Sequence, residues 1–147
     1  MIDGTIMLVE DNPDDIELTL RAFRKNNIAN RTVVFHDGIE ALDYLFGRGT
    51  YSGRNIKDQP RLILLDLKLP RMNGLQVLEQ IKASPVTSLL PVVILTSSKE
   101  ETDLIRSYKN GANSYVRKPV DFNQFVEAVR SIGLYWLLIN EPPPDSV

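Results

Sequence analysis

Four short apolar runs in this chain each lead into a polar residue that can take part in chemistry. Runs of this length, rich in Val, Ile and Leu and separated by helix-length segments, are typical of buried strands in a parallel sheet. Open parallel sheets present their functional groups at the carboxyl ends of the strands. The pattern therefore predicts an α/β fold in which these ends converge on one site. The polar residues concerned are Glu10, Asp11, Asp66, Thr96 and Lys118.

Length, composition and charge restrict the class of protein. The 147 residues, 43% hydrophobic and 24% charged, fit one globular domain with a sizeable core. A net charge of -2 lacks the excess of positive charge that general nucleic-acid or membrane binding requires, so we expect neither partner. The chain has no cysteine, and its N-terminus lacks the pattern of a signal peptide, which favours a cytoplasmic location. The apolar stretch 132–139 is shorter than the ~20 residues of a membrane span, and we interpret it as a buried or partner-facing helix end.

Turn and capping residues between the apolar runs predict five strands that alternate with five helices. Right-handed crossovers arrange such a chain as a three-layer α/β sandwich. We expect a single domain over residues 1–147, with about 4–140 folded and 141–147 forming a proline-rich tail. Residues 47–60 form a surface loop that is longer than most connections in compact domains. The expected strands are 6–9, 32–36, 62–66, 92–96 and 114–116. The expected helices run from Asn12-Pro13 to about Asn26, from Asp37 to Gly47, from Asn73-Gly74 to Ser84, up to Gly111, and onward from Asp121.

The converging residues suggest chemistry on a phosphoryl group. Three carboxylates held within ~5 Å of one another repel by ~3 kcal/mol per pair at an effective dielectric near 20, so the cluster needs a cation. The candidate ligands are hard oxygens without a nearby histidine, which favours Mg²⁺ or Mn²⁺ over zinc. Asp66 could then act as the nucleophile that forms an aspartyl phosphate. Lys118 and the Thr96 hydroxyl would stabilise the remaining phosphoryl oxygens.

Four motifs occur in the order and spacing of a known family: VEDNPDD, LILLDLKLPRMNG, VVILTSS and YVRKP. With these motifs, nearly the whole chain resembles the receiver domain of two-component response regulators. The resemblance implies a flavodoxin-like, doubly wound (βα)5 parallel sheet with strand order 2-1-3-4-5. It also implies that Asp66 accepts phosphate from a sensor histidine kinase. Such a protein is a phosphoacceptor that catalyses only its own phosphorylation and dephosphorylation.

The same resemblance assigns roles to the metal and phosphate ligands. Glu10, Asp11 and Asp66 would hold Mg²⁺, and the backbone carbonyl of Lys68 would complete the protein ligands. Lys118 would pair with the phosphorylated aspartate, and its bond to the following proline would be cis.

In this family, a hydroxyl and an aromatic residue switch together on phosphorylation. Here these are Thr96 and Tyr115, and the surface of the fourth helix, fifth strand and fifth helix would be remodelled. Side chains at Lys68 and Ser98 would tune the phosphate lifetime. Each of these residues also has a plainer interpretation, because Tyr115 could pack at a sheet edge and Lys68 and Ser98 could simply face solvent.

Two features resemble a narrower subgroup, the phytochrome-associated response regulators of cyanobacteria and related bacteria. These are the long loop 47–60 and the ending GLYWLLINEPPP. The resemblance implies a stand-alone receiver that pairs with a phytochrome-type histidine kinase and signals through protein contacts. We also predict a homodimer through the surface of the fourth helix, fifth strand and fifth helix, together with the aromatic ending. The alternative is that Tyr135 and Trp136 pack on the core of the monomer.

Three other functions fit parts of the pattern. A haloacid-dehalogenase-type phosphatase also uses a nucleophilic Asp after an apolar strand with Mg²⁺, but it requires a second Asp where this chain has Lys68. Flavin binding suits the fold, but the acidic loop after the first strand opposes the phosphate of the cofactor. A receiver-like interaction module without phosphotransfer is the third alternative.

Overall fold

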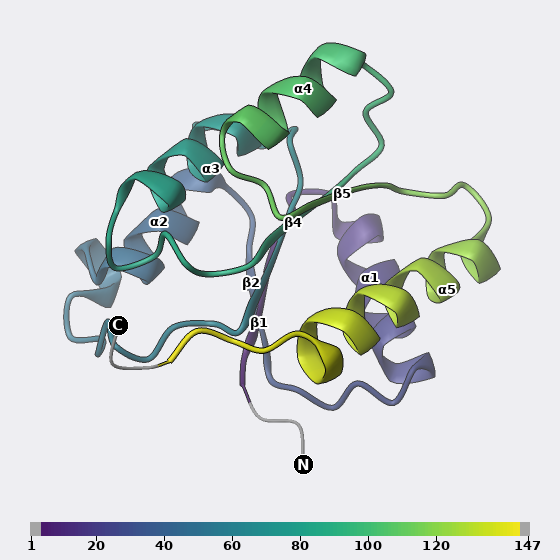
Figure 1. Ribbon diagram of the computed structural model, residues 1–147, viewed down its shortest axis with the longest axis horizontal. Coiled ribbons are helices and arrows are strands. Elements are labelled where there is room, and N and C mark those ends of the chain that lie inside the picture. The colour runs from purple at the N-terminus through teal and green to yellow at the C-terminus, as the bar shows by residue number, and fades with distance from the viewer. Residues whose placement is uncertain (1–3, 145–147) are drawn as a thin grey trace.

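The computed structural model describes residues 4–144 and has a central parallel sheet (Figure 1). Within the described chain, five strands are paired in the order β2-β1-β3-β4-β5, and every pairing is parallel. This order confirms the predicted doubly wound topology. Residues 1–3 and the end of the expected tail, 145–147, lie outside the described part, and residues 141–144 form neither helix nor strand. The strands are β1 (Ile6–Val9), β2 (Thr32–Phe35), β3 (Leu62–Leu65), β4 (Val92–Thr96) and β5 (Ser114–Arg117).

Helices cover both faces of this sheet and give the three layers that were predicted. Figure 1 shows α1 and α5 together on one face and α2, α3 and α4 side by side on the other. None of the helices in the described chain is long and apolar enough to cross a membrane. The helices are α1 (Pro13–Lys25), α2 (Gly38–Phe46), α3 (Gly74–Ala83), α4 (Glu101–Lys109) and α5 (Phe122–Gly133).

The helices begin at the side chains that the sequence suggested. The side chains of Asn12, Asp37 and Asp121 accept hydrogen bonds from backbone N–H groups in the first turns of α1, α2 and α5. Asn73 forms a reciprocal capping box with Gln76 at the start of α3. Each cap satisfies amide groups that would otherwise lack a partner, and each fixes the point at which a strand-following loop turns into a helix.

The three central strands, β1, β3 and β4, are buried on both faces, which explains why their sequences are continuous apolar runs. On one side, Met7, Val9, Ile63 and Leu65 pack with side chains of α2 and α3, and we call this the α2–α3 cluster. On the other side, alternate strand residues pack with Phe23 of α1 and the apolar stripe of α5, which we call the α1–α5 cluster. Helix α4 differs from its neighbours, because Ser107 is the one α4 residue in the described chain that is fully buried. The α1–α5 stripe includes Phe125, Val129 and Ile132.

The long connection 47–60 is fixed by aromatic packing. It contains a short 3-10 helix, Gly49–Tyr51. The ring of Tyr51 lies edge-on to Phe35 and Tyr44, with centroid distances of 5.9 and 5.3 Å. The Arg54 guanidinium stacks 3.8 Å from the Tyr44 ring and donates a hydrogen bond to the Tyr44 carbonyl. The loop is therefore at the surface, as predicted, but its inner side chains are packed against β2 and α2.

After α5 the chain continues as a π-helix, Leu134–Ile139. Leu137 is buried, and Trp136 is half-buried against the α1–α5 cluster. Tyr135, Leu138 and Ile139 remain exposed, at 47, 56 and 66%. The segment thus has one face on the core of the monomer and one apolar face in solvent.

Candidate functional site

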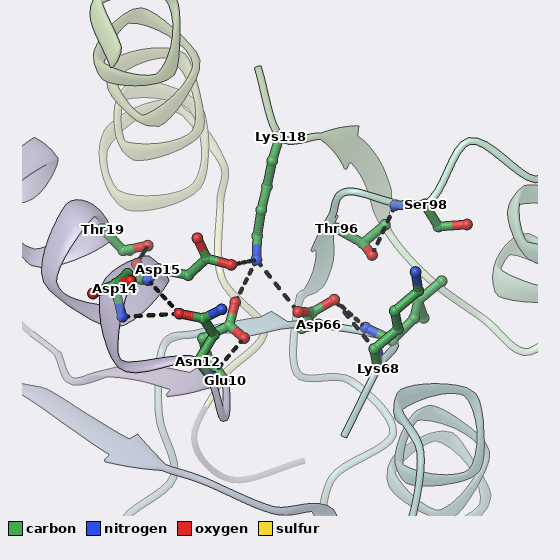
Figure 2. Close-up of polar contacts among 11 residues, drawn as sticks. Glu10, Asn12, Asp14, Asp15, Thr19, Asp66, Lys68, Thr96, Ser98 and Lys118 are labelled. Carbon is green, nitrogen blue, oxygen red and sulfur yellow. Dashed lines mark hydrogen bonds and ion pairs between the residues drawn. The ribbon is translucent and has the colours of Figure 1, made fainter. Parts of the chain in front are cut away.

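Asp66 lies directly after β3, at the carboxyl edge of the sheet. Its side chain is buried, and its two oxygens have different partners (Figure 2). Oδ1 accepts a hydrogen bond from the Leu67 N–H at 2.7 Å and a longer one from the Lys68 N–H at 3.5 Å. Oδ2 faces the Lys118 ammonium, with 3.3 Å between Oδ2 and Nζ. One carboxylate oxygen thus accepts hydrogen bonds from backbone amides, while the other is paired with a side-chain cation.

The loop after Asp66 folds back tightly at Gly74. The Gly74 N–H donates to the Leu67 carbonyl at 2.9 Å. A Cβ at Gly74 would lie 2.1 Å from the Asp66 carbonyl oxygen, so only glycine fits this approach. The glycine therefore sets the position of the backbone that carries Asp66.

Lys118 is the cation of the site. It follows β5, and its N–H donates to the Thr96 carbonyl at 2.8 Å, which aims the side chain across the sheet edge. Nζ makes ion pairs with Glu10, with Asp15 at 3.1 Å and with Asp66 (Figure 2). The Lys118 side chain is only 10% exposed. One buried ammonium thus joins carboxylates from three separate segments of the chain.

Burial controls the ionisation of this cluster. Glu10 is buried, and burial raises its pKa to about 7, with a further upward effect from Asp66 and an opposing effect from Lys118. Burial would lower the pKa of Lys118, but the charges of Asp66 and Glu10 outweigh it, so the pKa of Lys118 is raised. The ammonium therefore stays charged, and the buried acids favour a positive charge between them.

Thr96 is connected to helix α4 through Ser98. Thr96 is fully buried, and its Oγ1 accepts a hydrogen bond from the Ser98 N–H at 3.3 Å. The Ser98 hydroxyl donates to Asp103 Oδ2 at 2.6 Å, in the first turn of α4. Two consecutive hydrogen bonds through Ser98 therefore connect the Thr96 hydroxyl to α4.

Tyr115 lies on β5, with its ring against the α2–α3 cluster. Its hydroxyl is buried and has no hydrogen-bond partner among the described residues, and the same is true of the Ser107 hydroxyl on α4. An unsatisfied buried hydroxyl costs about 1–3 kcal/mol, so the α4–β5 side carries two unfavourable groups.

The structure assembles part of the expected metal site. Glu10 and Asp66 meet at Lys118, whereas Asp11 is exposed and makes no hydrogen bond or ion pair within the described chain. Among residues 4–144, no three Asp, Glu, His or Cys side chains form a ready-made metal site. The donor types nevertheless fit a hard divalent cation, because the buried carboxylates of Glu10 and Asp66 already share one positive charge. The Lys68 side chain is exposed, which leaves its backbone at the rim of the site.

The cis prediction for the Lys118-Pro119 bond is wrong. Residues 4–144 contain no cis peptide bond. Trans is the intrinsically favoured isomer by about 0.5–1 kcal/mol even before proline. With the trans bond, Lys118 still donates its N–H to Thr96 and reaches the carboxylates.

Asp15 is not among the site residues that the sequence pattern predicts. This residue lies on α1, 103 positions before Lys118, and reaches its ammonium from the helix side. The only available signal was the second acidic pair in VEDNPDD, and acids in a first helical turn are usually explained by the helix dipole.

Comparison with known proteins agrees with the fold. The model of the response regulator receiver domain family matches residues 6–130. The probable methanogenesis regulatory protein FilR2 of Methanothrix harundinacea is 43% identical over 139 residues, which cover 94% of this chain and 86% of that protein. The response regulator Rcp1 of Synechocystis is 36% identical over 132 residues, covering 90% of this chain and 88% of Rcp1.

Solved structures are similar over almost the whole chain. The phosphorylated cyanobacterial phytochrome response regulator RcpA aligns with a TM-score of 0.89 at 37% identity, covering 97% of this chain and 99% of RcpA. The Mn²⁺-bound form of Rcp1 aligns with a TM-score of 0.87 at 34% identity, covering 96% and 99% of the two chains.

Proposed function

Because the chain belongs to the response regulator receiver domain family, we propose that it is a phosphorylation switch in which Asp66 accepts a phosphoryl group from a sensor histidine kinase. The observation that carries the proposal is the pairing of Asp66 Oδ2 with the Lys118 ammonium at the carboxyl edge of the sheet. A nucleophilic oxygen and a charge that can stabilise a phosphoryl group are thereby held side by side.

In the proposed reaction, Oδ2 of Asp66 attacks the phosphorus atom of the donor. The bond between phosphorus and the leaving atom breaks, and its electron pair departs with the donor. Oδ1 stays bound to the Leu67 N–H, which keeps the carboxylate oriented during the transfer. Lys118 binds an oxygen of the new phosphoryl group, and the Thr96 hydroxyl donates to another.

A divalent cation would complete this site. We assign Mg²⁺, with Mn²⁺ as the alternative, to Glu10, Asp11, Asp66 and the Lys68 backbone carbonyl. The ion supplies charge neutralisation for the phosphoryl oxygens when it is bound. Support comes from the hard oxygen donors of this chain and from the Mn²⁺-bound form of its relative Rcp1.

The signal would leave the site through α4 and β5. When the Thr96 hydroxyl turns to the phosphoryl group, it gives up the hydrogen bond from the Ser98 N–H. The bond between Ser98 and Asp103 then transmits the change to α4, and Tyr115 adjusts its packing on β5. The Ser98 and Lys68 side chains, which border the site, would tune how long the phosphate persists. Output would be through contacts of the surface formed by α4, β5 and α5.

The proposed upstream partner is a phytochrome-type histidine kinase in the cytoplasm. The similarity to RcpA and Rcp1 supports this choice, whereas the similarity to FilR2 allows a kinase with a different input. The two kinds of kinase can be distinguished by measuring phosphotransfer to this protein. The rate from a purified phytochrome-type kinase is compared with the rate from an unrelated kinase. Equal rates from both kinases would remove the phytochrome assignment.

We also propose a homodimer through the α4-β5-α5 surface and the exposed face of the C-terminal π-helix. Tyr108 on α4 is 52% exposed, and Leu138 and Ile139 are more exposed still. Sedimentation velocity over a range of concentrations, with and without phosphate, tests this assembly. Monomeric behaviour at high concentration in both states would contradict it.

Intact-mass measurement with acetyl phosphate tests phosphotransfer directly. The protein in Mg²⁺ should gain a single phosphoryl group, which disappears in Asp66→Asn and when EDTA removes the metal. Asp58→Asn, in the loop 47–60, is the control, because its side chain is exposed and remote in sequence from the site motifs. If the wild-type protein bound Mg²⁺ in an NMR titration but formed no adduct, an interaction module without phosphotransfer would be favoured instead. An adduct that persists in Asp66→Asn would show that a residue other than Asp66 accepts the phosphoryl group.

A further inference from the structure

Lys118 has a third carboxylate partner that the proposed reaction does not use. Asp15 Oδ2 lies 3.1 Å from Lys118 Nζ, slightly closer than Asp66 Oδ2 at 3.3 Å. Figure 2 shows Asp15 approaching the ammonium from α1, on the side away from Thr96. The Asp15 side chain is 36% exposed, compared with 10% for Asp66. The contact therefore couples the buried cluster to the solvent-facing start of α1.

Local structure holds Asp15 in this place. Its backbone N–H donates to the Asn12 side chain at 3.2 Å, and its carbonyl accepts a hydrogen bond from Thr19 at 2.8 Å. Asp15 also lines a small cavity of about 70 Å³ between α1 and the start of α5, together with Lys118, Pro119 and Phe122. Asp15 and Lys118 thus share the wall of one cavity as well as an ion pair.

The three carboxylates take up the whole hydrogen-bonding capacity of the ammonium. A lysine ammonium has three N–H donors and no acceptor. In this structure Glu10, Asp15 and Asp66 each bind it. A phosphoryl group on Asp66 brings additional negative oxygens that also require Lys118. One of the three carboxylates must then give up its ion pair with Lys118. Asp15 is the most exposed of the three, so water can most easily solvate its carboxylate when the ion pair is lost.

We propose that Asp15 is a positioning residue that holds the Lys118 ammonium toward α1 in the unphosphorylated protein and so competes with Asp66 for it. The inference rests on the proposed function, because it assigns Asp15 to the same phosphotransfer. Loss of the Asp15 charge frees Lys118 for the phosphoryl group and therefore accelerates phosphorylation. Since ion pairs with one half-exposed partner couple weakly, the expected acceleration is about threefold.

The chain contains a matched control for this contact. Asp14 is the neighbouring acid in the same first turn of α1, it is exposed, and its side chain has no ion pair within the described residues. Asp14→Asn and Asp15→Asn therefore remove the same charge from the helix start, but only Asp15→Asn removes a partner of Lys118. Asp15→Glu restores the charge and tests whether a carboxylate is sufficient.

The first readout requires neither phosphate nor metal. In proton–nitrogen NMR of the lysine ammonium groups, Asp15→Asn should shift the Lys118 signal and speed the exchange of its protons with water, whereas Asp14→Asn should leave both unchanged. A Lys118 signal that is identical in wild type and Asp15→Asn would overturn the contact. Lys118→Met identifies the signal.

The second readout is the rate of labelling by acetyl phosphate in Mg²⁺, followed by intact mass. We expect Asp15→Asn to be labelled about threefold faster than Asp14→Asn, and Asp15→Glu to return to the wild-type rate. Equal rates for the two Asn variants, or slower labelling of Asp15→Asn, would reject the competition. If wild type itself is not labelled, it is the proposed phosphotransfer that fails, and the ammonium spectrum still decides whether Asp15 holds Lys118.

Discussion

Single residues decide the position of the proposed phosphoacceptor, Asp66. Asp66 stands at the point where an apolar strand meets a loop that returns against its own backbone. Gly74 makes this return possible, because any Cβ there would collide with the Asp66 carbonyl oxygen. The position of the reactive carboxylate thus depends on a residue that has no side chain.

Replacing this glycine tests that dependence. Gly74→Ala should lower the free energy of unfolding by about 2 kcal/mol or more, since backbone on both sides of the contact must move. It should also slow phosphorylation of Asp66. Gly53→Ala is the control, because a Cβ at Gly53 meets nothing within 4 Å. Urea unfolding of the two variants is the measurement, and equal stabilities would contradict the close-approach argument.

At the same scale, most of the residues expected to converge could be predicted from the sequence. Glu10, Asp66 and Lys118 follow three different strands and Thr96 ends a fourth, and the parallel topology brings them to one edge of the sheet. Asp11 does not join them, because alternate residues leaving a strand point to different sides and Asp11 points to solvent. Asp15 was missed because its role depends on a contact with Lys118 across 103 positions, which no local pattern encodes.

Among the elements, helix α2 shows how one side chain can both begin a helix and anchor a loop. Asp37 Oδ1 accepts a hydrogen bond from the Glu40 N–H at 2.8 Å. Arg71, in the loop after Asp66, donates to both oxygens of the same carboxylate at 2.8 Å. Burial acts to raise the pKa of Asp37, but the Glu40 N–H and Arg71 outweigh it, so the pKa is lowered.

This lowered pKa predicts a pH dependence. The unfolded chain binds a proton at Asp37 near the ordinary value of 3.8, while the folded protein binds it only at lower pH. The stabilisation is therefore complete above that value and is lost as the pH falls through the folded pKa. Asp37→Ala should cost about 1–2 kcal/mol at neutral pH, and Asp37→Asn should cost less because the amide oxygen still caps the helix.

Urea unfolding at neutral pH and at several values below pH 4 provides the measurement for Asp37. The stability difference between wild type and Asp37→Asn should shrink as the pH falls. A difference that stays constant over this range would mean that the Asp37 charge does not contribute.

Element boundaries were largely predictable, because they depend on local chemistry. The N-caps at Asn12, Asp37, Asn73 and Asp121 are as expected, and Gly47 ends α2 with a φ of 64°. What the sequence did not predict depends on packing between distant segments. The short helix in the loop 47–60 follows from aromatic contacts with β2 and α2, and the π-helix at 134–139 follows from the docking of its inner face on the α1–α5 cluster.

At the scale of the whole molecule, the C-terminal π-helix has a buried face that packs on the core and an exposed face proposed to form the dimer. Leu137 is 3% exposed and belongs to the α1–α5 cluster, whereas Leu138, the next residue, is 56% exposed. Leu137→Ala should therefore lower the free energy of unfolding by about 3 kcal/mol. Leu138→Ala should change it by less than about 0.5 kcal/mol but weaken the proposed dimer.

Urea unfolding at low protein concentration and sedimentation velocity at high concentration separate these two effects. If Leu138→Ala destabilised the protein as much as Leu137→Ala does, the outer face would be part of the core. If it left self-association unchanged, the dimer would not use this face.

Helix α4 buries fewer side chains than α3 or α5. Its one fully buried residue in the described chain, Ser107, contributes a hydroxyl without a partner among the described residues, and Tyr115 on β5 contributes another. Local opening of a protein is cheapest where little apolar surface is buried and polar groups are unsatisfied. We therefore expect the least costly local openings in this helix, which the Ser98–Asp103 hydrogen bond links to the proposed phosphorylation site. A modest change in charge at Asp66 would then act first on the part of the molecule that costs least to rearrange.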